Sequence, residues 1–268
     1  MKRAIITGAS GGMGYQTATL LAKNGYTVFA LDKNACERVD NVIPIEVDVT
    51  NVESVKSAYE QVLNYTDNID VIIHFAGVYM LDSLIEISDQ DFQKIFSINL
   101  FGAFYVNKTF IPLLKKGSKI LMTTSELAPL DPLPFTGIYA ISKSALDKYA
   151  YSLKMELQLL GISVSVLRAG AVSTSMLGVS TDALEKFCKK TTNYECNAKK
   201  FKKIVDSVES KNIPPIRIAQ KVYKIINKKN PKFAYKINRN KLLLLLNALP
   251  NAWQFGIIKN ILKNPKNK

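Results

Sequence analysis

The strongest constraint on the fold is the regular alternation of short apolar runs and helical segments over the first 170 residues. Six runs of five or six residues are rich in β-branched side chains, and helical patterns separate most of them. The runs are largely apolar throughout, as strands of a parallel sheet covered on both faces must be. The expected strands are 2–7, 27–31, 43–47, 69–74, 119–124 and 162–167, and the expected helices are 15–24, 50–64, 89–115 and 139–160. The pattern predicts an α/β domain with a doubly wound parallel sheet.

A glycine-rich stretch, TGASGGMG at 7–14, follows the first expected strand. Glycine lets the backbone turn sharply and approach a pyrophosphate, whose charge the free N–H groups of the next helix then bind. A turn without a ligand is the alternative, but the position after the first strand favours a dinucleotide and a Rossmann-type domain. Asp32 ends the second strand, where a carboxylate binds ribose hydroxyls and favours NAD over NADP. Lys33 beside it would soften that preference.

Tyr139 lies four residues before Lys143 in the stretch TGIYAISKSAL, and no other tyrosine has a lysine at this spacing. The two side chains would share one helix face. Taken alone, such a pair indicates no more than a surface contact worth a few tenths of a kcal/mol, roughly. Its interpretation therefore depends on the surrounding motifs.

Taken together, these motifs resemble the short-chain dehydrogenase/reductase family over about residues 1–240. The family's glycine motif is matched here by Thr7, Gly8, Gly12 and Gly14. Asp48, in EVDVT, resembles the aspartate with which the family contacts the adenine. The resemblance implies a catalytic set of Asn99 in SINLFGAF, Ser125 in MTTSELAP, Tyr139 and Lys143. It also implies a cofactor set of Thr7, Gly8, Ser10, Gly12, Met13, Gly14, Asp32, Asp48, Val49, Ala76, Gly77, Lys143, Gly170, Val172 and Thr174.

The implied activity is hydride transfer between an alcohol and nicotinamide, with Tyr139 moving the hydroxyl proton. A free phenol has a pKa of roughly 10 and is a poor base at neutral pH. We expect the Lys143 ammonium to lower the pKa of Tyr139 and, as the resemblance implies, to bond the nicotinamide ribose. Ser125 would hold the substrate oxygen, and Asn99 would carry a proton route through water.

The chain departs from the family pattern at three places. His74-Phe75-Ala76-Gly77 replaces Asn-Asn-Ala-Gly, which keeps the backbone approach to the cofactor but loses two amide side chains. We interpret His74 as a strand-end residue with a local hydrogen bond, and not as a base. Ala169 replaces a proline, and Ser125 and Tyr139 lie one residue further apart than usual. None of these changes removes a reacting group.

The segments expected to face the substrate are apolar. They comprise 78–81, 127–135 and a lid near Met176, Leu177 and Phe187 within residues 174–213. Such a lining suits a lipophilic substrate, for example a steroid or retinoid. The pattern from Pro214 to Pro250 is similar to the hydroxysteroid and retinol dehydrogenase branch. The expected organisation is a catalytic domain at 1–240 and an amphipathic tail at 241–268.

Charge is distributed unevenly along the 268 residues. Residues 1–185 contain 15 basic and 19 acidic residues, a net of −4, whereas 186–268 contain 21 and 3, a net of +18. A solvated lysine-rich surface is the first interpretation, and a peripheral membrane patch formed by the leucine-rich tail is the second. Nucleic acid is least favoured, because no binding motif accompanies the charge.

Other features exclude several classes of protein. His74 is the only histidine, which excludes histidine triads and multi-histidine metal sites, and no metal is expected. Three scattered cysteines (Cys36, Cys188 and Cys196) predict no disulfide framework and indicate a cytoplasmic protein. The N-terminus lacks the long apolar run of a secretion signal, and Leu242–Leu246 is far short of the ~20 residues of a membrane span.

The expected function is therefore an NAD-preferring oxidoreductase, with NADP as the alternative cofactor, acting as a homodimer or homotetramer. A second class of function is an inactive dinucleotide-binding sensor or scaffold. Such a protein would not need Ser125, Tyr139, Lys143 and Asn99 together.

Overall fold

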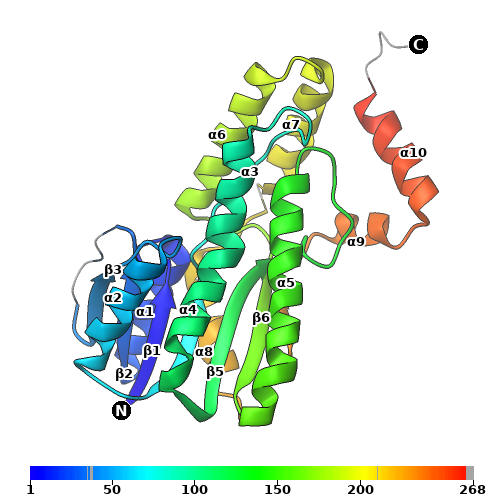
Figure 1. Cartoon of the computed structure of the whole chain (residues 1–268). Helices are drawn as coiled ribbons and strands as arrows, with labels where there is room; N and C mark the ends of the chain where they lie inside the picture. Colours follow the sequence, from blue (N-terminus) through cyan, green and yellow to red (C-terminus); the bar gives the residue numbers. More distant parts are fainter. Residues whose placement is uncertain (35, 37–38, 210, 264–268) are drawn as a thin grey trace.

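Seven parallel strands form one twisted sheet at the centre of the computed structural model, which describes residues 1–34, 36, 39–209 and 211–263, with backbone only at 175–182 and 208–209 (Figure 1). The strands are β1 (Lys2–Thr7), β2 (Tyr26–Asp32), β3 (Val42–Glu46), β4 (Ile69–His74), β5 (Leu114–Ser125), β6 (Ser163–Ala169) and β7 (Ala234–Ile237). Their order is β3-β2-β1-β4-β5-β6-β7, and each neighbouring pair is parallel. The predicted doubly wound parallel sheet is confirmed.

Helices cover both faces of the sheet. On one face, α1 (Gly12–Lys23) and α8 (Pro215–Ile226) bury Leu21, Ile218 and Val222 against β1, β2 and β4. On the other, α2 (Val52–Leu63), α4 (Gly102–Phe110) and α5 (Gly137–Leu157) bury residues such as Phe110. Both sides of the strands are apolar because helices shield both faces of the sheet from water.

The long helix predicted at 89–115 is interrupted. It consists of α3 (Asp89–Phe96), a π-helical turn (Ser97–Phe101) and α4, followed by a 3-10 turn at Ile111–Leu113. Pro112 lies in that 3-10 turn, where it lacks the N–H that an α-helix would need, and β5 begins at Leu114. The prediction was wrong beyond Phe110, and it did not anticipate the π turn that contains Asn99.

Helix α2 begins at Val52, two residues after the expected start at residue 50. Asn51 is the N-cap, and its side-chain oxygen accepts hydrogen bonds from the Glu53 and Ser54 amides. Thr50 instead donates its hydroxyl to Asp48, at 2.6 Å. Two adjacent capping residues compete at this position, and the one closer to the helix prevails.

Apart from α8, the helices that follow β6 lie beyond the carboxyl ends of the strands (Figure 1). In the segment expected to form the lid, α6 (Ser175–Lys190) and α7 (Glu195–Glu209) together form a cap over the sheet. The leucine-rich tail forms α9 (Lys241–Asn247) and α10 (Asn251–Leu262), and α10 projects to one side of the body (Figure 1). Across the described residues, every helix is too short or too polar to cross a membrane.

Candidate active site

The glycine stretch connects β1 to α1 and needs glycine at two positions for steric reasons. Gly8 has a φ of +69°, and a Cβ there would lie 2.6 Å from the Ala76 nitrogen. A Cβ on Gly14 would overlap the Gly8 carbonyl oxygen. No side chain caps α1 at Gly11, so the first turn of the helix presents bare amides. This is the geometry that binds a phosphate group.

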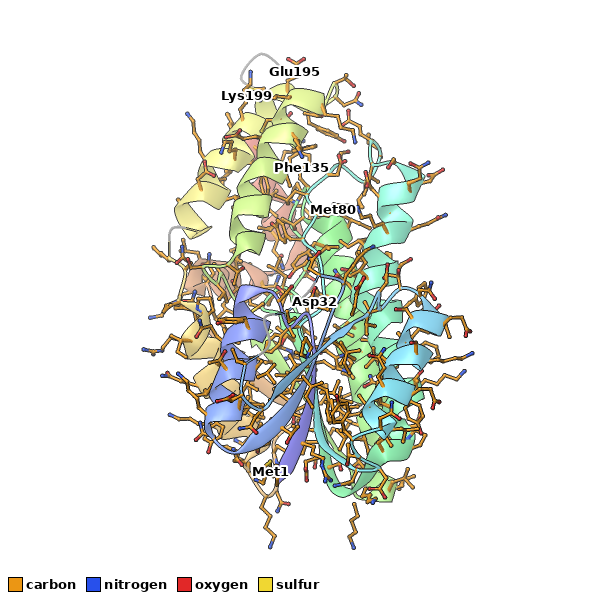
Figure 2. All side chains as sticks on the ribbon, turned by 90° about the vertical axis from the view of Figure 1, so that its left-hand side faces the viewer. Met1, Asp32, Met80, Phe135, Glu195 and Lys199 are labelled. Carbon is orange, nitrogen blue, oxygen red and sulfur yellow. The ribbon has the colours of Figure 1, made fainter. Side chains whose placement is uncertain are left out.

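Two carboxylates follow this loop at the ends of β2 and β3. Asp32 accepts hydrogen bonds from the Ser10 and Asn34 amides, both at 3.0 Å. Asp48 pairs with Lys33 at 2.9 Å and also accepts from Thr50, and these bonds lower its pKa to about 2. Lys33 is therefore directed to Asp48. Figure 2 shows Asp32 at the end of the sheet opposite Met1.

These groups line a cavity of about 520 Å³, which we call the glycine-loop cavity. The predicted cofactor residues that line it are Gly8, Ser10, Gly12, Met13, Gly14, Asp32, Asp48, Val49, Ala76, Gly77 and Thr174. Thr7 lies beneath it, fully buried, with its hydroxyl accepting from the Ala76 amide at 3.3 Å. Sequence reasoning missed Lys94 and Ser97, which line the cavity from the helical turns just before Asn99.

The end of β4 carries His74, which lines neither this cavity nor the next one. Its Nε2 lies 2.9 Å from Asn107 Oδ1, on α4, so the bond is to a neighbouring helix and not local as predicted. Burial lowers the pKa of His74 to about 4, against the opposing effect of that bond. The ring is thus neutral at pH 7 and serves packing and hydrogen bonding.

Asn99 holds the loop after β4. Its Oδ1 accepts from the Val78 amide at 2.8 Å, while its Nδ2 donates to the Val78 carbonyl and to Ser142 Oγ. A Cβ on Gly77 would lie 3.1 Å from both Asn99 Oδ1 and Lys143 Nζ, so a bare glycine lets these two groups come close. The Asn99 side chain is committed to these bonds, and a proton route through it stays a prediction.

Ser125, Tyr139 and Lys143 meet where β5 ends beside α5, and each is less than one-tenth exposed. The Ser125 hydroxyl is hydrogen-bonded to the Tyr139 phenol. Lys143 Nζ donates to the Thr123 carbonyl at 3.4 Å and lies 5.8 Å from the centre of the Tyr139 ring. The structure therefore brings together the three groups that the sequence singled out.

The predicted electrostatics of this group were wrong for the protein alone. Burial raises the pKa of Tyr139 to about 12, although the Ser125 bond opposes the shift. Burial also lowers the pKa of Lys143 to about 8. A cation lowers a neighbour's pKa only if it stays charged and near, and here desolvation disfavours both the ammonium and the phenolate. The acid form of Tyr139 is dominant at pH 7.

These three residues line a second cavity of about 200 Å³, the tyrosine cavity, together with Gly170 and Val172. A Cβ on Gly170 would overlap the Asn238 carbonyl oxygen, so only glycine fits. The rest of the lining is mostly apolar and includes Tyr79, Leu127, Leu133, Phe201, Ile204, Val205 and Leu243, with polar groups from Thr123, Thr124, Glu126 and Thr136. Sequence reasoning missed the residues of α7 and α9, because no motif links them to the site.

The predicted lid residues are placed differently. Phe187 is buried in the cap, with its ring centre 4.7 Å from that of Phe135, and does not line the tyrosine cavity. The side chains of Met176 and Leu177 lie outside the described residues. Met80 and Phe135 lie between Asp32 and the cap in Figure 2. The roof of the cavity is therefore α7 and α9.

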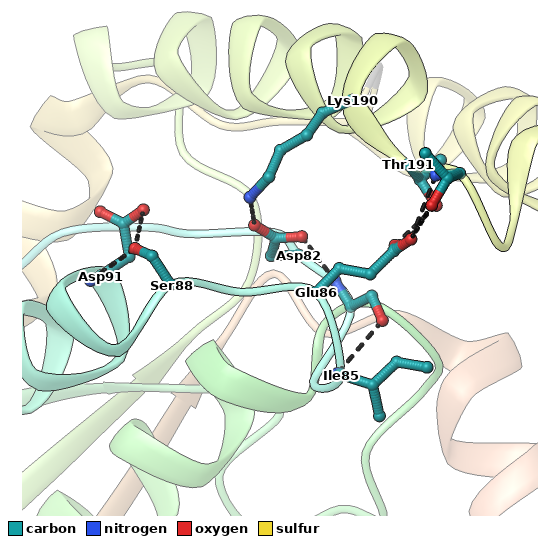
Figure 3. Close-up of polar contacts among 9 residues, drawn as sticks. Asp82, Ile85, Glu86, Ser88, Asp91, Lys190 and Thr191 are labelled. Carbon is teal, nitrogen blue, oxygen red and sulfur yellow. Dashed lines mark hydrogen bonds and ion pairs between the residues drawn. The ribbon is translucent and has the colours of Figure 1, made fainter.

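Polar contacts fix this cap over the site (Figure 3). Lys190 pairs with Asp82 at 2.9 Å, and Glu86 accepts from the Thr191 hydroxyl at 2.7 Å. Bonds from Thr191, and also from residues 192 and 193, lower the pKa of Glu86 to about 2. The turn between α6 and α7 is thereby tied to the loop that follows β4.

Comparison with known proteins gives a consistent result. A sequence profile described as "short chain dehydrogenase" matches residues 2–185. The 3-ketodihydrosphingosine reductase of Bacteroides thetaiotaomicron is 26% identical over 250 residues, covering 93% of this chain and 91% of that protein. Estradiol 17-beta-dehydrogenase 2 of Mus musculus is 30% identical over 210 residues, covering 72% and 54%.

Among solved structures, the Brucella melitensis 3-ketoacyl-(acyl-carrier-protein) reductase complexed with NADH superimposes with a TM-score of 0.72. It is 20% identical, and the superposition covers 88% of this chain and 96% of that chain. At this identity the likeness shows the fold.

Proposed function

The chain belongs to the short-chain dehydrogenase/reductase family of NAD(P)-dependent oxidoreductases, and on that premise we propose that it interconverts a lipophilic ketone and the corresponding secondary alcohol. The observation that carries the proposal is the meeting of Ser125, Tyr139 and Lys143 at the wall of an apolar cavity. The glycine-loop cavity adjoins it, since Met13, Phe75 and Thr174 line both.

The residues around the glycine-loop cavity fit a dinucleotide. The bare amides of α1 would hold the pyrophosphate, and Asp32 would accept from the adenosine ribose hydroxyls. When bound, the nicotinamide supplies or accepts the hydride. We propose NAD as the preferred cofactor, because Asp32 would repel a 2′-phosphate and Lys33 is already paired with Asp48.

Within the tyrosine cavity, the Ser125 and Tyr139 hydroxyls are placed to bind the substrate oxygen. In reduction the phenol of Tyr139 donates a proton to that oxygen, and in oxidation the phenolate removes it. The raised pKa of Tyr139 keeps the proton on the phenol at pH 7, which supports reduction as the working direction. The Lys143 ammonium would stabilise the Tyr139 phenolate once the proton has left.

The lining supports a lipophilic substrate. Phe201, Ile204, Val205 and Leu243 contribute apolar side chains from the cap and tail. The names of two relatives, a 3-ketodihydrosphingosine reductase and an estradiol 17-beta-dehydrogenase, agree with such a substrate. The steroid or retinoid branch predicted from the sequence is one form of this proposal.

The test is to follow NADH absorbance with a panel of steroid ketones, retinal, long-chain ketones and, as polar controls, sugars. The proposal expects turnover with at least one lipophilic ketone and none with the sugars. Tight NADH binding without turnover of any carbonyl compound would favour the sensor or scaffold. Preferential turnover of sugars would contradict the lipophilic substrate.

A further inference from the structure

The tyrosine cavity contains a carboxylate that the mechanism above does not use. Glu126 follows Ser125 directly, is 7% exposed, and lines the same cavity. The Cα atoms of consecutive residues are about 3.8 Å apart. The Glu126 side chain therefore starts close to Ser125, whose hydroxyl would bind the substrate oxygen. A buried acid in a largely apolar lining requires a partner.

Only one of its two oxygens has a hydrogen bond. Oε2 accepts from the Asn240 amide at 2.6 Å, whereas Oε1 accepts none in the described part of the chain. Oε1 lies against Gly170, where a Cβ would be 3.0 Å away. Thr123, which lines the same cavity, has a buried hydroxyl without a partner as well. The cavity floor therefore offers two unused polar atoms.

Two cations, Arg239 and Lys143, lie in or near this cavity, and neither forms an ion pair with Glu126 in the described part of the chain. Burial raises the pKa of Glu126, while the Asn240 bond and the charge of Arg239 lower it. Among the described residues, no basic nitrogen lies within the 4.0 Å of an ion pair with Glu126. A buried carboxylate with a free oxygen is best satisfied by a cationic donor.

We propose that Glu126 binds an ammonium group carried by the substrate next to its carbonyl, so that the substrate class is a long-chain α-amino ketone. The inference rests on the proposed reductase activity and narrows its substrate. Ser125 and Tyr139 bind the carbonyl oxygen, Glu126 Oε1 accepts from the ammonium, and the apolar chain extends between α7 and α9.

The experiment compares three probes with NADH: a long-chain methyl ketone, its α-hydroxy analogue and its α-amino analogue. Glu126→Gln removes the charge but keeps an amide oxygen for the Asn240 amide. Asp131→Asn is the matched control, because Asp131 lies in the same loop, bonds Gln254 at 3.3 Å and does not line the cavity. Calorimetry with a long-chain amino alcohol and the matching plain alcohol measures binding in parallel.

The wild type and Asp131→Asn should prefer the amino ketone over the methyl ketone by on the order of 10- to 100-fold in kcat/KM. Glu126→Gln should abolish that preference and the tighter binding of the amino alcohol, with the methyl ketone little changed. An equal loss for all three probes would show that Glu126 only anchors the tail, and a preference for the neutral probes would also overturn the proposal. If no probe turns over, the reductase assignment fails, and calorimetry still decides the role of Glu126.

A second inference comes from the outer face of the tail. Leu242 and Leu245 on α9 are 71% and 65% exposed, and Trp253 and Phe255 on α10 are 65% and 70% exposed. The inner face is used, since Leu243 lines the tyrosine cavity and Leu262 packs into the cap. The tail therefore presents apolar side chains outward.

The charge around this face identifies its partner. Residues 241–268, which form the tail, contain five lysines and no aspartate or glutamate. A two-fold contact with a second copy would place these positive charges against each other. We infer that α9 and α10 dock on an anionic lipid bilayer, with the apolar side chains in the interface and the lysines at the headgroups.

Flotation with phosphatidylserine-containing and pure phosphatidylcholine vesicles tests this inference. The wild type should float with the anionic vesicles, and a Leu242→Ser, Leu245→Ser, Trp253→Ser triple variant should not. Leu159→Ser is the control, because Leu159 is 83% exposed but lies outside the tail, in the 3-10 turn that follows α5. Absence of flotation by the wild type at low salt, or loss of a dimer in the triple variant, would overturn it.

Discussion

The glycine-loop cavity and the tyrosine cavity adjoin each other at the carboxyl ends of the strands, but different parts of the chain line them. The first is formed by loops of the sheet itself, with glycine backbone and carboxylates. The second takes Ser125 from β5 and Tyr139 from α5 but is roofed by α7 and α9, far along the sequence. On the proposed function, β5 and α5 supply the reacting groups, and the C-terminal helices would select the substrate.

The largest effect is expected at the glycine loop. Gly14→Ala would drive a Cβ into the Gly8 carbonyl and Ala9, which are backbone and cannot move aside cheaply. We expect a loss of stability at or above the roughly 1–3 kcal/mol of ordinary overpacking, and no NADH binding. Gly11→Ala is the control, because the added Cβ would lie 3.6 Å from its nearest neighbour, the Gly8 carbonyl oxygen. Thermal unfolding and NADH fluorescence would check both; equal behaviour of the two variants would contradict the account.

Lys143 lines the tyrosine cavity, with its Nζ close to Gly77 of the glycine-loop cavity, and its removal should separate activity from stability. Lys143→Met should lower kcat/KM on the order of 100- to 1,000-fold, since the phenolate loses its counter-charge. Because burial lowers the pKa of Lys143 from 10.5 to about 8, the folded state disfavours the ammonium below pH 8. The free energy of unfolding of the variant at pH 7 should therefore exceed that of the wild type, by up to roughly 3 kcal/mol. A fast but destabilised variant would reverse both expectations.

The sheet side also contains an acid-sensitive group in His74. Its pKa falls from 6.5 to about 4 on folding, so the unfolded chain binds the proton first. The contribution of neutral His74 to the free energy of unfolding is fully present above pH 6.5. It is lost as the pH falls toward 4, by up to roughly 3 kcal/mol. His74→Asn keeps an amide for Asn107 and should flatten this dependence. Parallel unfolding curves for the two proteins across this range would refute the assignment.

The smallest effect concerns cofactor choice at Asp32. Asp32→Asn keeps a hydrogen-bond acceptor but removes the charge, and should shift the NADPH-to-NADH preference on the order of 10-fold toward NADPH. Glu46→Gln, at the register-matched end of β3 and exposed, is the control. Binding constants for both cofactors would measure the shift. A wild type that already prefers NADPH would remove Asp32 from its proposed role.

The contrast between the cavities also explains what the sequence could predict. Strands, glycine loop and catalytic groups follow from local patterns, such as β-branched runs and the spacing of Tyr139 and Lys143. Burial depends on the whole fold, so the pKa of Tyr139 moved in the direction opposite to the prediction. Phe201 and Leu243 reach the cavity only through tertiary packing, which the local pattern around Phe187 does not reveal. Glu126 is visible in the sequence as an acid beside Ser125.

The central claim is that the Tyr139 phenol transfers the proton in a site that binds the dinucleotide independently. Single-turnover oxidation of bound NADH by a lipophilic ketone, in the wild type and in Tyr139→Phe, measures it directly. We predict NADH affinity within a few-fold of the wild type and a rate of hydride transfer at least about 1,000-fold lower. Retention of most of the rate by Tyr139→Phe, with NADH binding intact, would contradict the account.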